Sequence, residues 1–256
     1  MTYKTSLVLA SVLGFAVAMS QPAASAEIKV LTTGAFKQVV VALVPEFEKA
    51  TGHKVVVDNG TVGQLTQRVN GGETFDVLVL NPRGIEDYIK QGKIVAGTNA
   101  VLAKVGVGVM VKDGAPKPDV SNVEAFKKAL INAKTVGYID PASGGSSGIY
   151  VDGLLVKLGI ADQIKPKAKL KRGGHVSDLV VAGEAEIGIH QMSEIVGQKG
   201  VTLVGPLPAE IQNYTTYVGG VSSAAKDAEA AKAFIKVLTG PSAQAVLTKT
   251  GMEAAR

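Results

Sequence analysis

The sequence predicts an α/β fold in two lobes, each a mainly parallel sheet flanked by helices, with a cleft between the lobes. Three observations predict it. Strand-like and helix-like segments alternate from residue 28 to the C-terminus, a pattern typical of parallel α/β sheets. Two long apolar segments, 102–111 and 215–222, interrupt this alternation. The chain has 256 residues, which is enough for two domains of about 100 to 150 residues each.

The first part of the chain has the elements of one lobe. Apolar runs at 28–31, 54–57 and 76–80 predict strands, and near-continuous runs of this kind suit parallel strands buried on both faces. Helices are predicted at 35–49, 64–70 and 85–91, the last ending at Gly92 as a C-cap. The segment 102–111 (LAKVGVGVMV) is longer than a typical strand. We expect it to leave the first lobe and carry the chain into the second.

The second part of the chain repeats the alternation. Helices are predicted at 123–132, 149–158 and 176–182, and strands at 135–139, 168–170, 186–190 and 202–204. The strand 215–222 should return the chain, and helices 224–239 and 242–249, divided by Gly240-Pro241, end it. We therefore expect one lobe from 27–104 with 217–256, and the other from 105–216.

The N-terminus predicts export. Lys4 precedes an apolar stretch at 7–18, and Ala24-Ser25-Ala26 has the small residues of a cleavage site. The stretch is shorter than the roughly 20 residues a spanning helix needs. We expect a signal peptide at 1–26, cleaved after Ala26, and a periplasmic mature chain; a retained N-terminal anchor is the alternative. The absence of cysteine argues against a lipid-modified cysteine anchor.

Composition excludes several classes of function. With no cysteine, and three histidines of which no two are four residues apart, no metal site and no cofactor are expected. The net charge is +5, but its basic residues are scattered and not interleaved with aromatics, so nucleic-acid binding is not expected. We interpret the Gly- and Ser-rich run 144–148 (GGSSG) as a ligand loop rather than a nucleophile elbow. No phosphate-binding GxxxxGK[ST] loop occurs. We expect a monomer.

Glycine- and hydroxyl-rich turns follow several predicted strands, at the edge where parallel α/β sheets bind ligands. Free backbone N–H groups, small hydroxyls and the positive ends of helix dipoles can bind an anion there. N-capping is the alternative for any single turn, but several turns converging from two lobes favour a ligand site. The candidate ligand-binding residues are Thr33, Gly34, Ala35, Thr61, Val62, Asn81, Arg83, Ser143, Gly144, Gly145, Ser146, Ser147, Gly174, His175, His190 and Gln191.

Three motifs carry a family resemblance. They are Asp140-Pro141 with Gly148-x-Tyr150, Lys157-Leu158-Gly159-Ile160, and Gly183-Glu184-Ala185-Glu186-Ile187-Gly188. With them the chain resembles the molybdate-binding periplasmic proteins and the wider superfamily of bacterial extracellular solute-binding proteins, over residues 27–255. The resemblance implies a type II periplasmic binding protein fold with two connecting strands as the hinge. It also implies a small anionic solute and an inner-membrane ABC transporter permease as partner.

The chain departs from the molybdate binders where they hold the oxyanion. Their first-loop serine is replaced by Ala35, their second-loop serine by Thr61-Val62, and their second-lobe tyrosine by Gln191. The alanine before Gly-x-Tyr is Ser147. We therefore expect a di- or tricarboxylate as the solute rather than molybdate.

Four basic side chains are candidates for contacting that carboxylate: Arg83, Arg172, His175 and His190. Arginine suits bidentate capture of a carboxylate; Arg83, which follows an apolar strand, is the preferred candidate, and Arg172 is expected on a solvated face. The motifs also resemble the aconitate isomerase branch of the superfamily, so an isomerase is the alternative function. In that case His190 and His175 are the candidate catalytic residues, because the pKa of histidine suits proton transfer at neutral pH.

Overall fold

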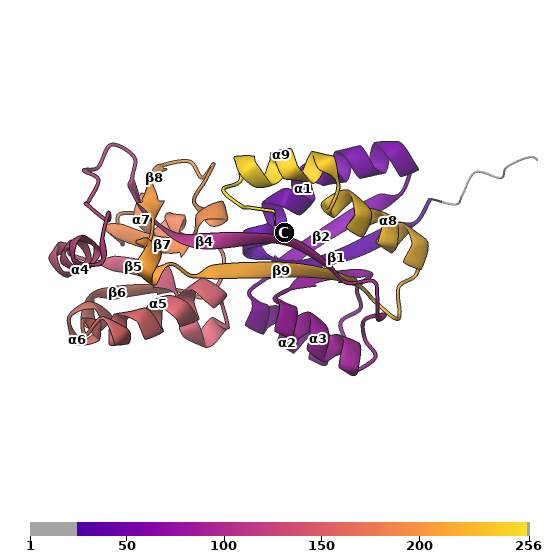
Figure 1. Cartoon of the computed structure of the whole chain (residues 1–256), viewed down its shortest axis with the longest axis horizontal. Helices are drawn as coiled ribbons and strands as arrows, with labels where there is room; N and C mark the ends of the chain where they lie inside the picture. Colours follow the sequence, from indigo (N-terminus) through magenta and orange to yellow (C-terminus); the bar gives the residue numbers. More distant parts are fainter. Residues whose placement is uncertain (1–24, 255–256) are drawn as a thin grey trace, which may run out of the picture.

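The structure, a computed structural model, describes residues 25–254. Residues 1–24, nearly all of the predicted signal peptide (1–26), lie outside the described range. The described chain forms two lobes that lie side by side along the long axis of the molecule and are joined by two strands (Figure 1). Within residues 25–254, no helix has both the length and the apolar character needed to cross a membrane.

The first lobe is built on a five-stranded part of the sheet with the order β2-β1-β3-β9-β4. The pairs β1–β2 and β1–β3 are parallel, whereas β3–β9 and β9–β4 are antiparallel. The bounds are β1 Glu27–Thr33, β2 Lys54–Gly60, β3 Val77–Leu80, β4 Ala100–Lys112 and β9 Tyr214–Val221.

Helices cover both faces of this part of the sheet. Because side chains alternate along a strand, Val77 and Val79 of β3 pack in one cluster with α1 (Gly34–Thr51), α8 (Ala228–Leu238) and α9 (Pro241–Lys249). Leu78 and Leu80 pack on the other face with α2 (Val62–Asn70) and α3 (Pro82–Lys90). Burial on both faces explains why β3 reads as an unbroken apolar run.

The second lobe continues the sheet as β4-β7-β5-β6, with β8 also paired to β4. The pairs with β5 are parallel, and those with β4 are antiparallel. Its strands are β5 Val136–Ile139, β6 Ala168–Lys171, β7 Ile187–Gln191 and β8 Val201–Pro206. Its helices are α4 Val123–Asn132, α5 Ser146–Lys157, α6 Ala161–Ile164 and α7 Ser177–Val181.

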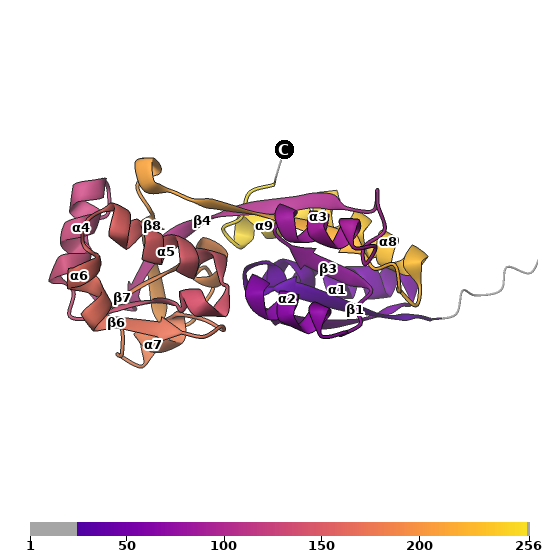
Figure 2. The same cartoon turned by 90° about the horizontal axis from the view of Figure 1, so that it is seen from below.

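Strand β4 belongs to both lobes (Figure 2). Residues 100–106 pair with β9 in the first lobe, and residues 107–112 pair with β7 and β8 in the second. At the crossing, the Gln212 amide accepts from Val107 N–H at 2.8 Å and donates to Val107 C=O at 2.9 Å. The side chain therefore replaces a strand neighbour where the main-chain ladder changes partner.

The two long strands predicted at 102–111 and 215–222 correspond to β4 and β9. The lobe boundaries predicted at 104/105 and 216/217 stay a prediction. The final helix pair begins later than predicted because Asp227 caps α8, its side chain accepting from Ala230 N–H at 2.9 Å. The short helix α6 was not predicted.

Candidate functional site: a cleft between the lobes

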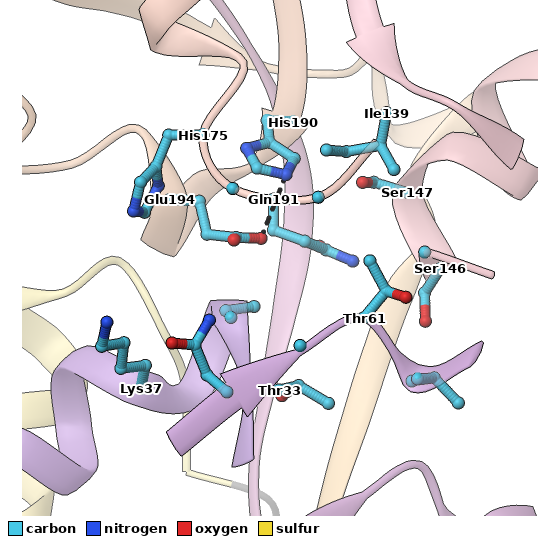
Figure 3. A pocket seen from close by; sticks show the side chains of 18 of the residues that line it. Thr33, Lys37, Thr61, Ile139, Ser146, Ser147, His175, His190, Gln191 and Glu194 are labelled. Carbon is cyan, nitrogen blue, oxygen red and sulfur yellow. Dashed lines mark ion pairs between the residues drawn. The ribbon is translucent and has the colours of Figure 1, made fainter. Parts of the chain in front are cut away.

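A cavity of about 60 Å³ lies where the loops of the two lobes meet (Figure 3). At about 10–15 Å³ for each water, that is room for about four to six waters. The walls come from the loops after β1 and β2 in the first lobe, and from the loops after β5, β6 and β7 in the second. Of the sixteen candidate residues, twelve line the cavity: Thr33, Gly34, Ala35, Thr61, Val62, Gly145, Ser146, Ser147, Gly174, His175, His190 and Gln191. That they bind a ligand stays a prediction.

Two helices of the first lobe begin at the cavity. Thr33 is the N-cap of α1, but its side chain makes no capping hydrogen bond, and its buried Oγ1 has no partner within residues 25–254. Thr61 caps α2 through a reciprocal pair of hydrogen bonds with Gln64. Its hydroxyl also donates to Ser143 C=O of the second lobe. The two threonines therefore differ: the Thr61 hydroxyl forms a hydrogen bond between the lobes, whereas the Thr33 hydroxyl makes no hydrogen bond to the described residues.

Helix α5 of the second lobe begins on the opposite wall. Gly145 is its N-cap, without a side-chain cap, and Ser146 and Ser147 form its first turn. Gly148 packs so tightly that a Cβ there would lie 2.2 Å from Ile139 C=O. The Tyr150 hydroxyl donates to Ile211 C=O at 2.5 Å. The Gly-x-Tyr motif thus anchors α5 in the second lobe, and the first residues of this helix, with its N-cap Gly145, line the cavity.

A buried pair of ionisable side chains forms the rear wall. His190, on β7, lies with its Nε2 3.2 Å from Oε2 of Glu194, and the two side chains are 2% and 9% exposed. Burial raises the pKa of Glu194 to about 8. Burial, with a smaller effect of His175, lowers the pKa of His190 to about 3. At neutral pH both groups are therefore uncharged.

Three further polar residues complete the wall. His175 is half-buried, and its pKa is lowered chiefly by burial, with the nearby Lys37 acting in the same direction and Asp178 opposing it. Lys37, on α1, is half-buried and lines the cavity from the first lobe. Gln191 donates from Nε2 to Thr215 Oγ1 at 2.8 Å, while its buried Oε1 has no partner among the described residues. The cavity therefore contains a cation and several unpaired polar atoms.

Comparison with known proteins places the chain in a family. The family model described as bacterial extracellular solute-binding protein matches residues 28–253. The chain belongs to this family. This solute-binding protein is 29% identical over 230 residues to an aconitate isomerase of a Pseudomonas species, with 88% of the chain and 86% of the relative covered.

The molybdate binders are relatives of this solute-binding protein as well. It is 29% identical over 247 residues to the molybdate-binding protein of Azotobacter vinelandii, with 90% of both chains covered. A solved structure of the periplasmic molybdate-binding protein from A. vinelandii aligns with a TM-score of 0.76 at 19% identity, covering 90% of this chain and all of that one. This likeness confirms the type II periplasmic binding protein fold.

Four candidate residues of this solute-binding protein do not line the cavity. Arg83, the preferred carboxylate ligand, is 92% exposed on α3, with its Nε 3.9 Å from Asp87. Asn81 accepts from Gly84 N–H at 2.8 Å and so caps α3. Neither residue lines the cavity, because the first lobe contributes the loops after β1 and β2 to its walls and no residue of the loop after β3. That they bind the ligand stays a prediction.

The other two, Ser143 and Gly144, join the lobes instead. Ser143 C=O accepts from Thr61, and Gly144 C=O accepts from Gly63 N–H at 3.2 Å. Gly144 has a φ of 72°, which favours glycine. Arg172 is 84% exposed and pairs with Asp140 at 3.0 Å, in agreement with the expected solvated face.

Several lining residues were missed: Lys37, Asn59, Gly60, Ile139, Gly173, Glu194 and Tyr217. Helical periodicity could have found Lys37, because it lies three and four residues after Gly34 and Thr33 at the start of a helix. Glu194 lies four residues after His190, but this spacing alone does not distinguish a buried pair from an exposed one. No sequence signal marks Tyr217, since its exposure to the cavity depends on β9 passing between the lobes.

Proposed function

We propose that this solute-binding protein captures a small organic carboxylate in the cleft between its lobes. The observation that carries this proposal is the composition of the cavity. The first turns of α1, α2 and α5 meet there with Lys37, and the carboxyl that also lines it, Glu194, is uncharged at neutral pH. Helix N-termini and a cation favour an anion.

The apolar part of the cavity supports an organic anion over an inorganic one. Ala35, Val62 and Ile139 lie among the polar lining residues. A di- or tricarboxylate has carbon atoms to place against such side chains, whereas molybdate presents oxygen in every direction. An apolar contact opposite an oxyanion oxygen would leave that oxygen without a hydrogen bond, which costs about 1–3 kcal/mol.

Transport follows from the family. We propose that the mature protein resides in the periplasm, as the predicted signal peptide and the extracellular family support, and delivers its solute to an inner-membrane ABC transporter permease. A thermal-shift screen tests the ligand. Trans-aconitate, citrate, succinate, molybdate, tungstate and sulfate are compared, and a ligand at 100 times its Kd should add about 2.7 kcal/mol of stability. Stabilisation by molybdate and by no carboxylate would refute the proposal.

A second candidate function is the isomerisation of aconitate. The His190–Glu194 pair favours it, because a proton must leave one carbon and return to another, and a buried acid beside a neutral imidazole offers both a donor and an acceptor. The relative with that activity spans most of the chain. Incubating the protein with trans-aconitate and following the cis isomer separates an enzyme from a pure binder.

The histidine variants then test the roles. For a catalytic His190, His190→Ala should lower turnover by about 10²- to 10⁴-fold with binding largely retained. As a ligand contact alone, it should weaken binding by about 1–3 kcal/mol. His175→Ala is measured beside it. Absence of isomerisation above the uncatalysed rate in the wild type would exclude the enzyme, and full activity in both variants would exclude the histidine assignment.

A further inference from the structure

Glu194 lies where the two lobes and the cavity meet. It ends the short 3₁₀ turn Met192–Glu194 that follows β7 in the second lobe, yet its carboxyl reaches the first residue of α1 in the first lobe (Figure 3). A Cβ added to Gly34 would lie 2.7 Å from Oε1 of Glu194. A side chain at position 34 would therefore displace the carboxyl from the start of α1.

The two carboxyl oxygens have different surroundings. Oε2 lies 3.2 Å from His190 Nε2, whereas Oε1 lies at the start of α1, beside the cavity. The side chain is only 9% exposed, so bulk water does not solvate it as it would a surface glutamate. A carboxyl this buried is stable only if a ligand or a proton satisfies its oxygens.

Two of the groups beside Glu194, His190 and Tyr217, carry no charge that could neutralise an ionised carboxylate. His190 remains uncharged, because its pKa is lowered to about 3 by burial and by His175. The phenol of Tyr217 on β9 faces it and is also uncharged, since burial raises its pKa well above 10. His175 before α7 and Lys37 on α1 are the other titratable groups lining the cavity, and the pKa of His175 is lowered.

We propose that Glu194 determines the specificity of the cleft for carboxylates: its protonated carboxyl donates the hydrogen bond that a ligand carboxylate accepts. This inference rests on the proposed function. A bond between an acid O–H and a carboxylate is charge-assisted and short, about 2.5–2.7 Å. If Glu194 were ionised, the same geometry would set two negative charges against each other in a site of low dielectric constant, and the anion would be repelled.

The proposal predicts how binding depends on pH. Below pH 7 Glu194 carries its proton and the affinity should be constant; as the pH rises through about 8, where Glu194 ionises, the affinity should fall. If only the protonated form binds, the Kd at pH 9 should be about tenfold higher than at pH 7. Binding at pH 8 should take up about half a proton per ligand.

Calorimetry of the full mature chain tests this with trans-aconitate and succinate as the tri- and dicarboxylate probes. Each titration is run from pH 6.5 to 9 in two buffers of different ionisation enthalpy, which gives the proton uptake directly. Glu194→Gln keeps an N–H donor but cannot titrate, so its Kd should change by less than about threefold over this range. Glu186→Gln is the matched control, because Glu186 lies in the same lobe and only accepts from Lys134 N–H, at 2.7 Å, outside the cleft.

The outcomes separate this inference from the proposed function. A tenfold pH effect in the wild type and in Glu186→Gln, absent from Glu194→Gln, supports the role of Glu194. The same pH effect in Glu194→Gln, or none in the wild type, overturns it while carboxylate binding stands. If the wild type binds neither probe nor any other carboxylate in the thermal-shift screen, the proposed function and this inference both fail. Thermal unfolding of each variant without ligand identifies any loss of fold.

Discussion

Replacing Gly63 by alanine should weaken ligand binding without weakening the fold. Gly63 lies in the first turn of α2 with an ordinary negative φ, so alanine is compatible with its backbone and favours the helix by up to about 1 kcal/mol. The added Cβ would, however, lie 2.8 Å from both Gly144 Cα and Ser143 C=O of the other lobe. Both are backbone atoms and cannot rotate away, so the lobes must separate.

The magnitude follows from the contacts that this separation breaks. Besides the longer bond of 3.4 Å from Gln64 Nε2 to Arg172 C=O, two hydrogen bonds join the lobes here: Gly63 N–H to Gly144 C=O at 3.2 Å, and Thr61 hydroxyl to Ser143 C=O. At about 0.5–1.5 kcal/mol each, their loss costs about 1–3 kcal/mol of closure free energy. The Kd of a ligand enclosed by closure should rise by roughly 5- to 150-fold.

Calorimetry with the best-binding carboxylate, and thermal unfolding without ligand, check both halves of this prediction. Gly153→Ala is the matched control, because Gly153 is also in a helix, α5, and a Cβ there meets no atom within 4 Å. We expect Gly153→Ala to bind like the wild type, and Gly63→Ala to bind more weakly with an equal or higher melting temperature. Equal Kd values for the two variants would refute the reasoning that this contact controls closure.

Three further predictions concern charge and stability. Lys37→Gln should weaken carboxylate binding by about tenfold and reduce its salt dependence, whereas Arg83→Gln, at a 92% exposed position, should leave calorimetric binding unchanged. Asp76→Ala should lower the urea-unfolding free energy by about 2–4 kcal/mol, because this buried carboxylate accepts two backbone N–H groups at 2.7 and 2.8 Å. Hydrogen bonding to Arg68 lowers the pKa of Glu73 from 4.5 to about 2. The ionised Glu73 carboxylate therefore stabilises the fold above pH 4.5, and this contribution is lost as the pH falls towards 2. Urea titrations of Glu73→Gln at a series of pH values should lack this loss.

Most of the fold could be predicted from the sequence because its signals are local. The apolar run of β3 and the long segments that became β4 and β9 were placed to within a few residues. The direction in which strands pair is not a local property: β4 and β9 are antiparallel to their neighbours, and no residue pattern distinguishes this. Helix α6 has four residues, too few to give a helical period.

The cleft was predictable in part, again because some of its signals are local in the sequence. Turns after strands point to a shared edge of the sheet, and so Thr33, Ser146 and His190 were identified and line the cavity. Arg83 also follows a predicted strand, but the second lobe does not cover its turn, and its side chain stays exposed outside the cavity. Glu194 was not predicted because a glutamate is usually exposed, and nothing in the sequence around it indicates burial. Its burial depends on the approach of the other lobe at Gly34.

The chain path gives the two lobes different positions in the order of synthesis. Strand β9 lies between β3 and β4 in the sheet of the first lobe, and α8 and α9, which cover that sheet, follow it. The first lobe therefore lacks a central strand and two helices until β9, α8 and α9 emerge, although its synthesis starts before that of the second lobe. The elements of the second lobe from α4 to β8 are contiguous, and they can fold on the partner strand β4 before the first lobe is complete. A growing chain therefore cannot close the cleft until these three elements of the first lobe have followed the whole second lobe.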